Sequence, residues 1–186
     1  MSELRISSPL TDAVVRALHV GERVLLSGAV YTARDAAHKR MVETLNMSGA
    51  LPFALEGQII YYVGPSPTKP GDVIGSAGPT TAGRVDDYTI PLLARGLKGM
   101  IGKGKRSASV RQGMIDYGAV YLVAVGGAAA LIADRIKRVD LIAYEELGTE
   151  AIRRFEVEDF PLVVANDVYG MDLYEAGKAA YRQESP

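Results

Sequence analysis

Residues 76–84 bring together the residue types that bind a small anion. A Gly-Pro pair favours a tight bend, after which the hydroxyls of Thr80 and Thr81 and free backbone N–H groups can face one concavity. Arg84 adds a planar fork that binds a carboxylate through two parallel hydrogen bonds. The same residues also suit a plain cap, in which Thr80 or Thr81 is the N-cap of a helix that starts near Arg84. Spacing alone leaves both interpretations open.

Residues 32–41 place cations where a second helix is expected to begin. Thr32 is the expected N-cap of this helix, with Arg34 in its first turn. Arg34 and His38 are four residues apart and therefore share one helix face. A cation in a first turn opposes the helix dipole, and a chain tolerates this better when an anion binds there. A solvated basic helix face is the alternative.

The absence of cysteine limits the chemistry that this chain can perform alone. It excludes disulfides, thiol catalysis and a thiolate-ligated iron–sulfur cluster on this chain, and His19 and His38 offer no Cys/His spacing for a metal. A net charge of −1 gives no broad field that would attract nucleic acid or an anionic membrane. Neither a spanning helix of about 20 apolar residues nor a signal-peptide core is recognisable, so a cytoplasmic location is expected.

Strand-like and helix-like segments alternate along the chain. The expected helices are 10–20, 34–46, 84–93, 107–117, 128–136 and one after Asp172, and the expected strands are 24–31, 59–64, 99–102, 120–124, 140–144, 156–160 and 162–166. This alternation predicts an α/β fold with a partly parallel sheet and right-handed crossovers. The length predicts a single domain over residues 1–186, with flexible ends at 1–8 and 177–186.

Other polar residues are interpreted as structural. Glu145, Glu146 and Glu150 are expected to form a solvated acidic cluster at a helix start, with acid–base work as the less favoured alternative. Tyr61 and Tyr62 are expected to divide between the core and its covering layer, because adjacent strand residues face opposite ways.

Several segments, taken together and in order, resemble one protein family. They are residues 33–40, 60–65, 78–84, 101–104, 124–130, 145–151 and 156–161. They are similar to the class I, iron–sulfur type fumarate hydratases, specifically the beta subunit or C-terminal domain that is shared with the L-tartrate dehydratase beta subunit. Weaker similarity extends from Leu10 to Glu175 and so covers nearly the whole chain. The segments are specific to the family, though not to one substrate within it.

This resemblance implies a fold, an activity and a divided active site. The fold would be a three-layer swivelling β/β/α domain, which fits the alternation of elements. The activity would be that of a hydro-lyase that reversibly hydrates fumarate to (S)-malate, with L-tartrate or a methyl-substituted C4 diacid as alternative substrates. The 4Fe-4S cluster would lie on a cysteine-bearing alpha subunit, in a hetero-oligomer of two alpha and two beta chains. A non-catalytic carboxylate-binding or assembly domain is the alternative from another class.

The resemblance also implies roles for individual residues. Thr80 would be the catalytic base. The substrate-binding residues would be Arg34, Thr81, Arg84 and Lys103. From its place on the helix face of Arg34, and not from the resemblance, His38 is expected to support the substrate-binding groups, with a helix-surface position as the alternative. Asp35 is expected to cap or orient Arg34. No residue of this chain would bind a metal.

The lysine assignment has an alternative within the same loop. Residues 102–107 lack the full Gly-x-x-x-x-Gly-Lys-Ser/Thr spacing of a phosphate-binding loop, and a lone Gly-Lys-Gly is typical of a mobile turn. By position, the family's lysine corresponds to Lys103, with Lys105 as the alternative. If the cations bind one diacid, the fold must bring Arg34, Arg84 and the lysine to one rim. Three unpaired cations would repel one another there and stay solvated in the isolated chain.

Overall fold

The computed structural model describes residues 3–125 and 127–182. The strands are β1 (Leu4–Ser7), β2 (Arg23–Thr32), β3 (Ile59–Tyr61), β4 (Gly99–Gly102), β5 (Val120–Val123), β6 (Ile136–Ala143) and β7 (Ile152–Asn166). The helices are α1 (Asp12–Ala17), α2 (Asp35–Asn46), α3 (Asp86–Leu93), α4 (Ala108–Tyr117), α5 (Ala129–Ala133) and α6 (Leu173–Tyr181). Two short 3-10 helices, η1 (Ala82–Val85) and η2 (Glu145–Glu150), complete the described elements.

The strands form one sheet in the order β1-β2-β3-β4-β5-β7-β6. Strands β1 to β5 pair in parallel, whereas β7 runs antiparallel to β2, β5 and β6. Because β7 pairs with both β2 and β5, the sheet closes into a ring through β3 and β4. The prediction of an α/β fold with a partly parallel sheet is confirmed.

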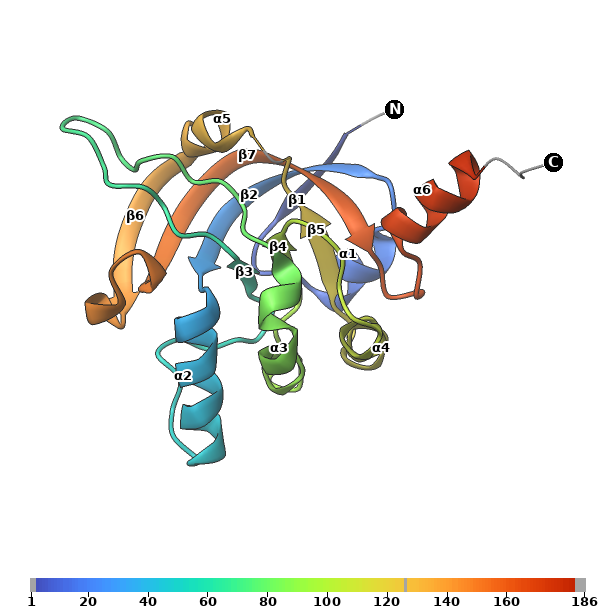
Figure 1. Cartoon of the computed structure of the whole chain (residues 1–186), viewed down its shortest axis with the longest axis horizontal. Coiled ribbons are helices and arrows are strands. Elements are labelled where there is room, and N and C mark those ends of the chain that lie inside the picture. Colours follow the sequence, from blue (N-terminus) through green and yellow to red (C-terminus); the bar gives the residue numbers. More distant parts are fainter. Residues whose placement is uncertain (1–2, 126, 183–186) are drawn as a thin grey trace.

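The elements lie in three layers (Figure 1). The long strands β2, β7 and β6 arch over the short parallel strands β3, β4 and β5, and helices α2, α3 and α4 lie side by side on the outer side of the short strands. One apolar core fills the ring between the two strand layers, and a second separates the short strands from the helices. Tyr61 is buried in the first core and Tyr62 in the second, so these neighbours do face opposite ways.

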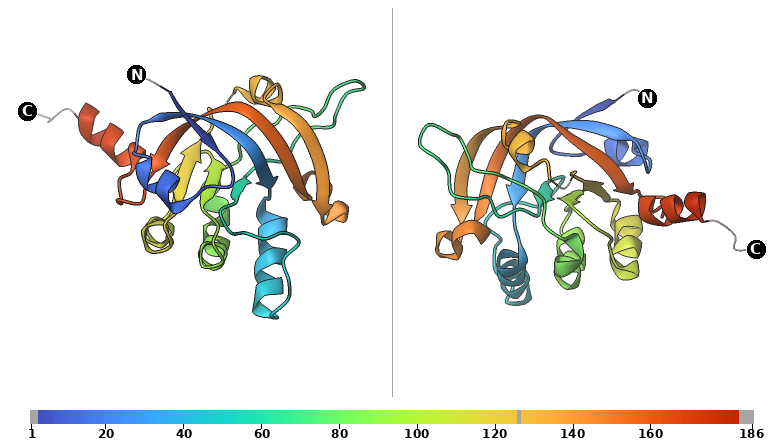
Figure 2. Two further views of the ribbon diagram at one scale, coloured as in Figure 1. Left: turned by 180° about the vertical axis from the view of Figure 1, so that it is seen from behind. Right: turned by 45° about the horizontal axis from the view of Figure 1, so that its top comes forward.

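The two chain ends that the sequence predicts to be flexible contain regular structure in their described parts. Strand β1 lies within 1–8 and pairs in parallel with β2, and α6 extends into 177–186 as far as Tyr181. Figure 2 shows β1 and α6 from two further sides. No helix within residues 3–125 and 127–182 is long and apolar enough to cross a bilayer.

Several element boundaries differ from the sequence predictions, and the differences around β7 and α5 are described here. The last two expected strands are one strand, β7, which continues through Pro161. Its partner β6 pairs with β7 only as far as Val157 of β7. On that edge, therefore, β6 has no carbonyl opposite Pro161 that would have to accept a hydrogen bond from the N–H that proline lacks. The helix expected over 128–136 ends at Ala133, and β6 already begins at Ile136.

Candidate functional site

Arg34 lies at the junction of β2 and α2, as the N-cap residue of the helix. Its side chain makes no cap hydrogen bond, because a guanidinium carries no acceptor. The prediction that Thr32 is the N-cap is wrong. Thr32 ends β2, and its hydroxyl donates to the carbonyl of Ala151 at 3.3 Å and accepts the N–H of Arg153 at 2.9 Å.

Glu150 supplies the missing cap from a distant part of the chain. Its Oε2 accepts the backbone N–H of Ala36 at 2.8 Å, and its Oε1 lies 3.7 Å from Nη2 of Arg34. The prediction of a solvated Glu150 is therefore wrong, since its side chain is only 24% exposed. Its neighbour Glu146 is more exposed and pairs with Arg40. The chain positions of these glutamates gave no sign of the difference.

Asp35 joins the two arginines of the predicted site. Its Oδ1 accepts a hydrogen bond from Nε of Arg84 at 3.0 Å, and its Oδ2 lies 4.0 Å from Nη2 of Arg34. Arg34 and Arg84, which are fifty residues apart in the chain, thus lie on the same rim of the protein. The prediction that these cations stay unpaired is wrong for both arginines, because each faces a carboxylate.

The lysine segment runs alongside the threonine turn. Lys103 donates its backbone N–H to the carbonyl of Thr80 at 3.0 Å and forms a parallel bridge with Thr81. The side chain of Lys103 is exposed. Lys105 instead donates to Glu175 on α6 at 2.5 Å, a bond that raises the pKa of the Lys105 amine. This geometry favours Lys103 over Lys105 as the lysine of the site.

The hydroxyl of Thr80 is held by the peptide of Tyr62. Thr80 Oγ1 donates to the Tyr62 carbonyl at 2.9 Å, and the same carbonyl accepts the N–H of Thr80 at 2.7 Å. Thr80 is half-buried and Thr81 exposed. Thr81 is the N-cap residue of η1 without a side-chain cap bond, which weakens the interpretation of this turn as a plain helix cap.

His38 lies one helical turn after Arg34 and is fully buried. Its Nδ1 lies 2.8 Å from the carbonyl of Arg34, so Nδ1 carries the proton and donates it, and its ring meets that of Tyr62 edge-on. Burial lowers the pKa of His38 to about 4 against the opposing effect of this hydrogen bond, and the charge of Arg106 lowers it further. His38 is therefore neutral near pH 7. Its expected supporting role stays a prediction that this position fits.

Because His38 is buried and neutral, we expect it to weaken the fold at acid pH. Its pKa in the folded chain is about 4, below the unfolded value of about 6.5, so the unfolded chain binds an extra proton between these values. The free energy of unfolding should fall as pH falls through this window, by about 2 kcal/mol between pH 7.5 and 5 from this group. His38→Asn should remove about that much of the difference when urea unfolding is compared at the two pH values. An identical pH dependence in both proteins would contradict this assignment.

Arg106 anchors the lysine segment and was not predicted. Its guanidinium donates to Asp86 Oδ1 at 2.7 Å, to the hydroxyl of Tyr62 at 2.9 Å and to Oγ1 of Thr89 at 2.7 Å. Its side chain is fully buried, and the paired carboxylate and hydroxyls offset the cost of burying its charge. These contacts tie the end of the turn that begins at Lys103 to α3.

Gly104 fixes the path of the chain between the two lysines. Its φ is 79°, a left-handed conformation that glycine adopts without strain. Its N–H donates to the hydroxyl of Tyr174 at 3.1 Å, and its carbonyl accepts the hydroxyl of Tyr121 at 3.0 Å. Hydrogen bonds at both the N–H and the carbonyl of Gly104 therefore fix this turn.

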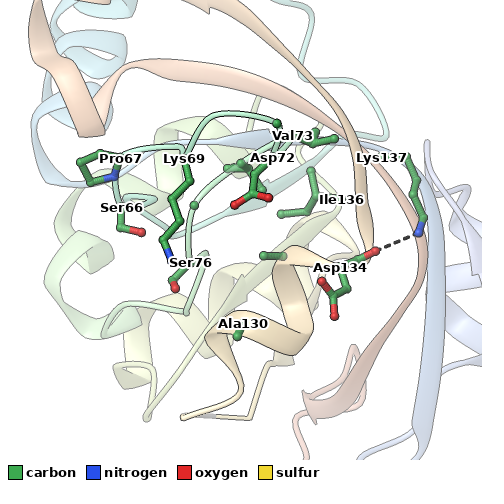
Figure 3. Close-up of a pocket in the computed structure, with 14 residues that line it drawn as sticks. Ser66, Pro67, Lys69, Asp72, Val73, Ser76, Ala130, Asp134, Ile136 and Lys137 are labelled. Atoms are coloured by element: carbon green, nitrogen blue, oxygen red, sulfur yellow. Dashed lines mark hydrogen bonds between the residues drawn. The ribbon is translucent and has the colours of Figure 1, made fainter.

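A cavity of about 500 Å³ lies apart from this rim (Figure 3). It opens between the loop 66–76 and the segment from α5 to the start of β6, and in Figure 3 Lys69 reaches across it toward Ser76. None of the residues that line it is a predicted site residue. The predicted site is thus a rim of charged and hydroxyl side chains rather than this cavity.

The residues of the chain do not fit an iron–sulfur cluster. The sequence has no cysteine, and the described residues contain no group of three or more His, Asp or Glu side chains that could hold a metal ion. The site brings cationic and hydroxyl side chains together, a combination of residue types suited to an anion.

Comparison with known proteins identifies the family. A family model described as "Fumarase C-terminus" matches residues 1–177. "Putative L(+)-tartrate dehydratase subunit beta" of Methanocaldococcus jannaschii is 42% identical over 172 residues, which cover 89% of this chain and 88% of that protein. "Fumarate hydratase 2" of Leishmania major is 42% identical over 157 residues, or 83% of this chain and 28% of that protein. "Fumarate hydratase class I, aerobic" of Escherichia coli K12 is 40% identical over 158 residues, or 84% and 29%.

This chain therefore spans most of the length of the M. jannaschii relative but under a third of the length of these two fumarate hydratases. The family model and the relatives cover the segments that carry the rim residues. The chain belongs to the fumarase C-terminus family.

Proposed function

We propose that this chain is the beta subunit of an iron–sulfur hydro-lyase that reversibly hydrates fumarate to (S)-malate. The observation that carries the proposal is the shared rim, where Asp35 joins Arg34 to Arg84 and the Thr81–Lys103 bridge sets the lysine beside the threonine turn. A C4 dicarboxylate presents two anionic ends, and two arginine forks with one flexible ammonium suit both ends.

The cations of the rim are proposed to stabilise charge that develops during the reaction. Dehydration of malate removes a weakly acidic C–H proton from the carbon next to the one that carries the hydroxyl. Negative charge then builds up on the carboxylate attached to that carbon, where Arg84 and Lys103 would stabilise it. The arginine that lies further along the rim, Arg34, would hold the other end of the substrate.

Thr80 is proposed to take that proton on its Oγ1. A threonine hydroxyl is a poor base at its ordinary pKa, so nearby positive charge must stabilise its deprotonated form. Arg84 and Lys103 are the cations of the rim closest in the chain to this turn. Before Thr80 can act, the proton that its hydroxyl donates to the Tyr62 carbonyl must pass to bulk water, because a peptide carbonyl is no base.

The remaining chemistry is assigned to a partner. Because this chain has no residues that fit the cluster, the proposal places the 4Fe-4S cluster on a cysteine-bearing alpha subunit. There an open iron would act as a Lewis acid toward the departing hydroxyl. Two alpha and two beta chains in one cytoplasmic assembly complete the proposal.

L-tartrate is the second candidate substrate. It is favoured by the M. jannaschii relative, whose printed name includes tartrate dehydratase and whose length this chain nearly matches. L-tartrate is also a C4 dicarboxylate, so the same cations would bind its two ends, and the distinguishing pocket wall would come partly from the alpha subunit.

Reconstitution tests the proposal. We expect the isolated chain to be folded, colourless and inactive, and to gain hydratase activity when it is mixed anaerobically with its cluster-bearing alpha subunit. Exposure to oxygen should abolish that activity, because an open cluster iron is readily oxidised and lost. Rates with fumarate, L-tartrate and mesaconate are measured side by side. A dominant tartrate rate would replace the fumarate assignment, and robust activity of this chain alone would refute the two-subunit proposal.

A further inference from the structure

Glu150 is a residue of the rim to which the proposed mechanism gives no role. It ends η2 and lies 114 residues from the helix start that it contacts. Its two carboxylate oxygens contact different groups: Oε2 accepts the N–H of Ala36 at 2.8 Å, and Oε1 faces Arg34 Nη2 at 3.7 Å. One carboxylate therefore contacts both the backbone and the side chain at the start of α2.

The start of α2 needs a cap from outside the helix. The first N–H groups of any helix lack partners within the helix, and an N-cap arginine offers no side-chain acceptor. Asp35, in the first turn, uses its Oδ1 on Arg84 instead. Glu150 thus satisfies a backbone donor of this first turn and places a negative charge at the positive end of the helix dipole.

The same carboxylate orients the guanidinium of Arg34 without consuming its donors. Nη2 lies 3.7 Å from Glu150 and 4.0 Å from Asp35, which is close enough for charge attraction but too far for a hydrogen bond. On the other side the guanidinium lies against Gly64, where an added Cβ would be 2.6 Å from Nη1. Arg34 is therefore confined by backbone and by charge, and no hydrogen bond to another described residue uses the N–H groups of its Nη2, which leaves them for a ligand.

We propose that Glu150 is the positioning residue for Arg34: its carboxylate fixes the first turn of α2 and holds the guanidinium in the orientation that receives one carboxylate of the substrate. This inference rests on the proposed function, because it takes Arg34 as a substrate-binding residue. It adds that the orientation of Arg34 depends on η2, a segment for which no contact with the substrate is proposed.

Three variants of Glu150 separate the two roles of its carboxylate, which are to accept the N–H of Ala36 and to face Arg34 with a negative charge. Glu150→Gln keeps an oxygen that can accept the N–H of Ala36 but removes the charge that faces Arg34. Glu150→Ala removes both, and Glu150→Asp keeps the charge on a shorter side chain. Glu146→Gln is the matched control, because Glu146 belongs to the same η2 and pairs with Arg40 further along α2.

In the reconstituted enzyme, Glu150→Gln should raise KM for the dicarboxylate about tenfold and change kcat by less than about threefold, since a binding group is lost. Its Tm should fall less than that of Glu150→Ala, because it loses only the charge at the helix dipole, whereas Glu150→Ala also loses the helix cap and should lower Tm by about 2–4 °C. Glu150→Asp should recover part of the affinity. Glu146→Gln should change neither KM nor Tm. If Glu150→Gln behaved like Glu146→Gln, or bound substrate more tightly than the wild type, the inference would be overturned while the proposed function stood.

A second readout needs no turnover. In the isolated chain labelled with ¹⁵N-arginine, the Nε–Hε signal of Arg34, assigned by its loss in Arg34→Lys, should be observable because Nε is buried. This signal should shift in Glu150→Gln and stay in place in Glu146→Gln. An Arg34 signal that does not move in Glu150→Gln would overturn the inference, whatever the activity of the reconstituted enzyme. A reconstituted enzyme that is inactive on every C4 diacid tested would refute only the proposed function.

Discussion

Replacing Thr80 with valine is expected to lower kcat of the reconstituted enzyme by about 10²–10⁴-fold, the usual contribution of a positioned base, and to leave KM for fumarate nearly unchanged. Valine has the shape of threonine but no oxygen that can take the proton. Thr80→Ser, which restores the hydroxyl, should recover most of the turnover.

A structural effect of Thr80→Val must be separated from the chemical one. The hydroxyl of Thr80 also donates to the carbonyl of Tyr62, and its loss should cost about 1 kcal/mol of stability. Thermal unfolding measures that cost directly. Thr81→Val is the matched control, since Thr81 is exposed in the same turn and is expected to affect KM more than kcat. Equal losses of turnover and affinity in Thr80→Val would make Thr80 a binding residue instead.

Most elements of the fold could be predicted because their signals are local. The short strand β4 has the predicted bounds, and α4 and α6 begin directly after the capping side chains of Ser107 and Asp172. The continuity of β7 through Pro161 could not be predicted, because it depends on which edge of β7 is left unpaired by β6. Strand β1 is likewise stabilised by pairing with β2 rather than by its own sequence.

The site residues likewise fall into two groups: those that local sequence signals reveal and those that only the fold reveals. The threonine turn, Arg34 and Arg84 could be found because their side-chain types and spacing suggest anion binding within short segments. Glu150 and Arg106 could not, since their partners lie far along the chain: Ala36 is 114 residues from Glu150, and Tyr62 is 44 residues from Arg106. A glutamate among other glutamates and an arginine beside a lysine turn look solvated until the fold provides these partners.

Arg84→Lys is expected to lower kcat/KM for fumarate by about 100-fold, although it preserves the positive charge. Arg84 uses Nε on Asp35, which leaves the N–H groups of its terminal nitrogens for a substrate carboxylate. Its side chain is 57% exposed, so these nitrogens are accessible to a substrate that enters from the open side of the rim. A lysine ammonium cannot bind Asp35 and make a bidentate contact with a substrate carboxylate at the same time. Losing one to two charge-assisted hydrogen bonds, at about 1.5–3 kcal/mol each, accounts for the expected loss.

The control for Arg84→Lys is Arg40→Lys, because Arg40 is an arginine of α2 whose carboxylate partner, Glu146, lies outside the rim. Steady-state kinetics of the reconstituted enzyme should show no change for this control.

The Arg84→Lys variant also changes the surroundings of Asp35, because Asp35 loses its hydrogen bond from Nε of Arg84. Its Oδ2 already lies 4.0 Å from Arg34, so Asp35 is then free to approach Arg34 and occupy its donors. Asp35→Asn in the Arg84→Lys background should therefore recover part of the lost affinity, whereas Asp35→Asn alone should weaken binding, because it releases Arg84. Wild-type kcat/KM in Arg84→Lys would show that Arg84 acts only as a charge, and the bidentate role proposed for it would have to be abandoned.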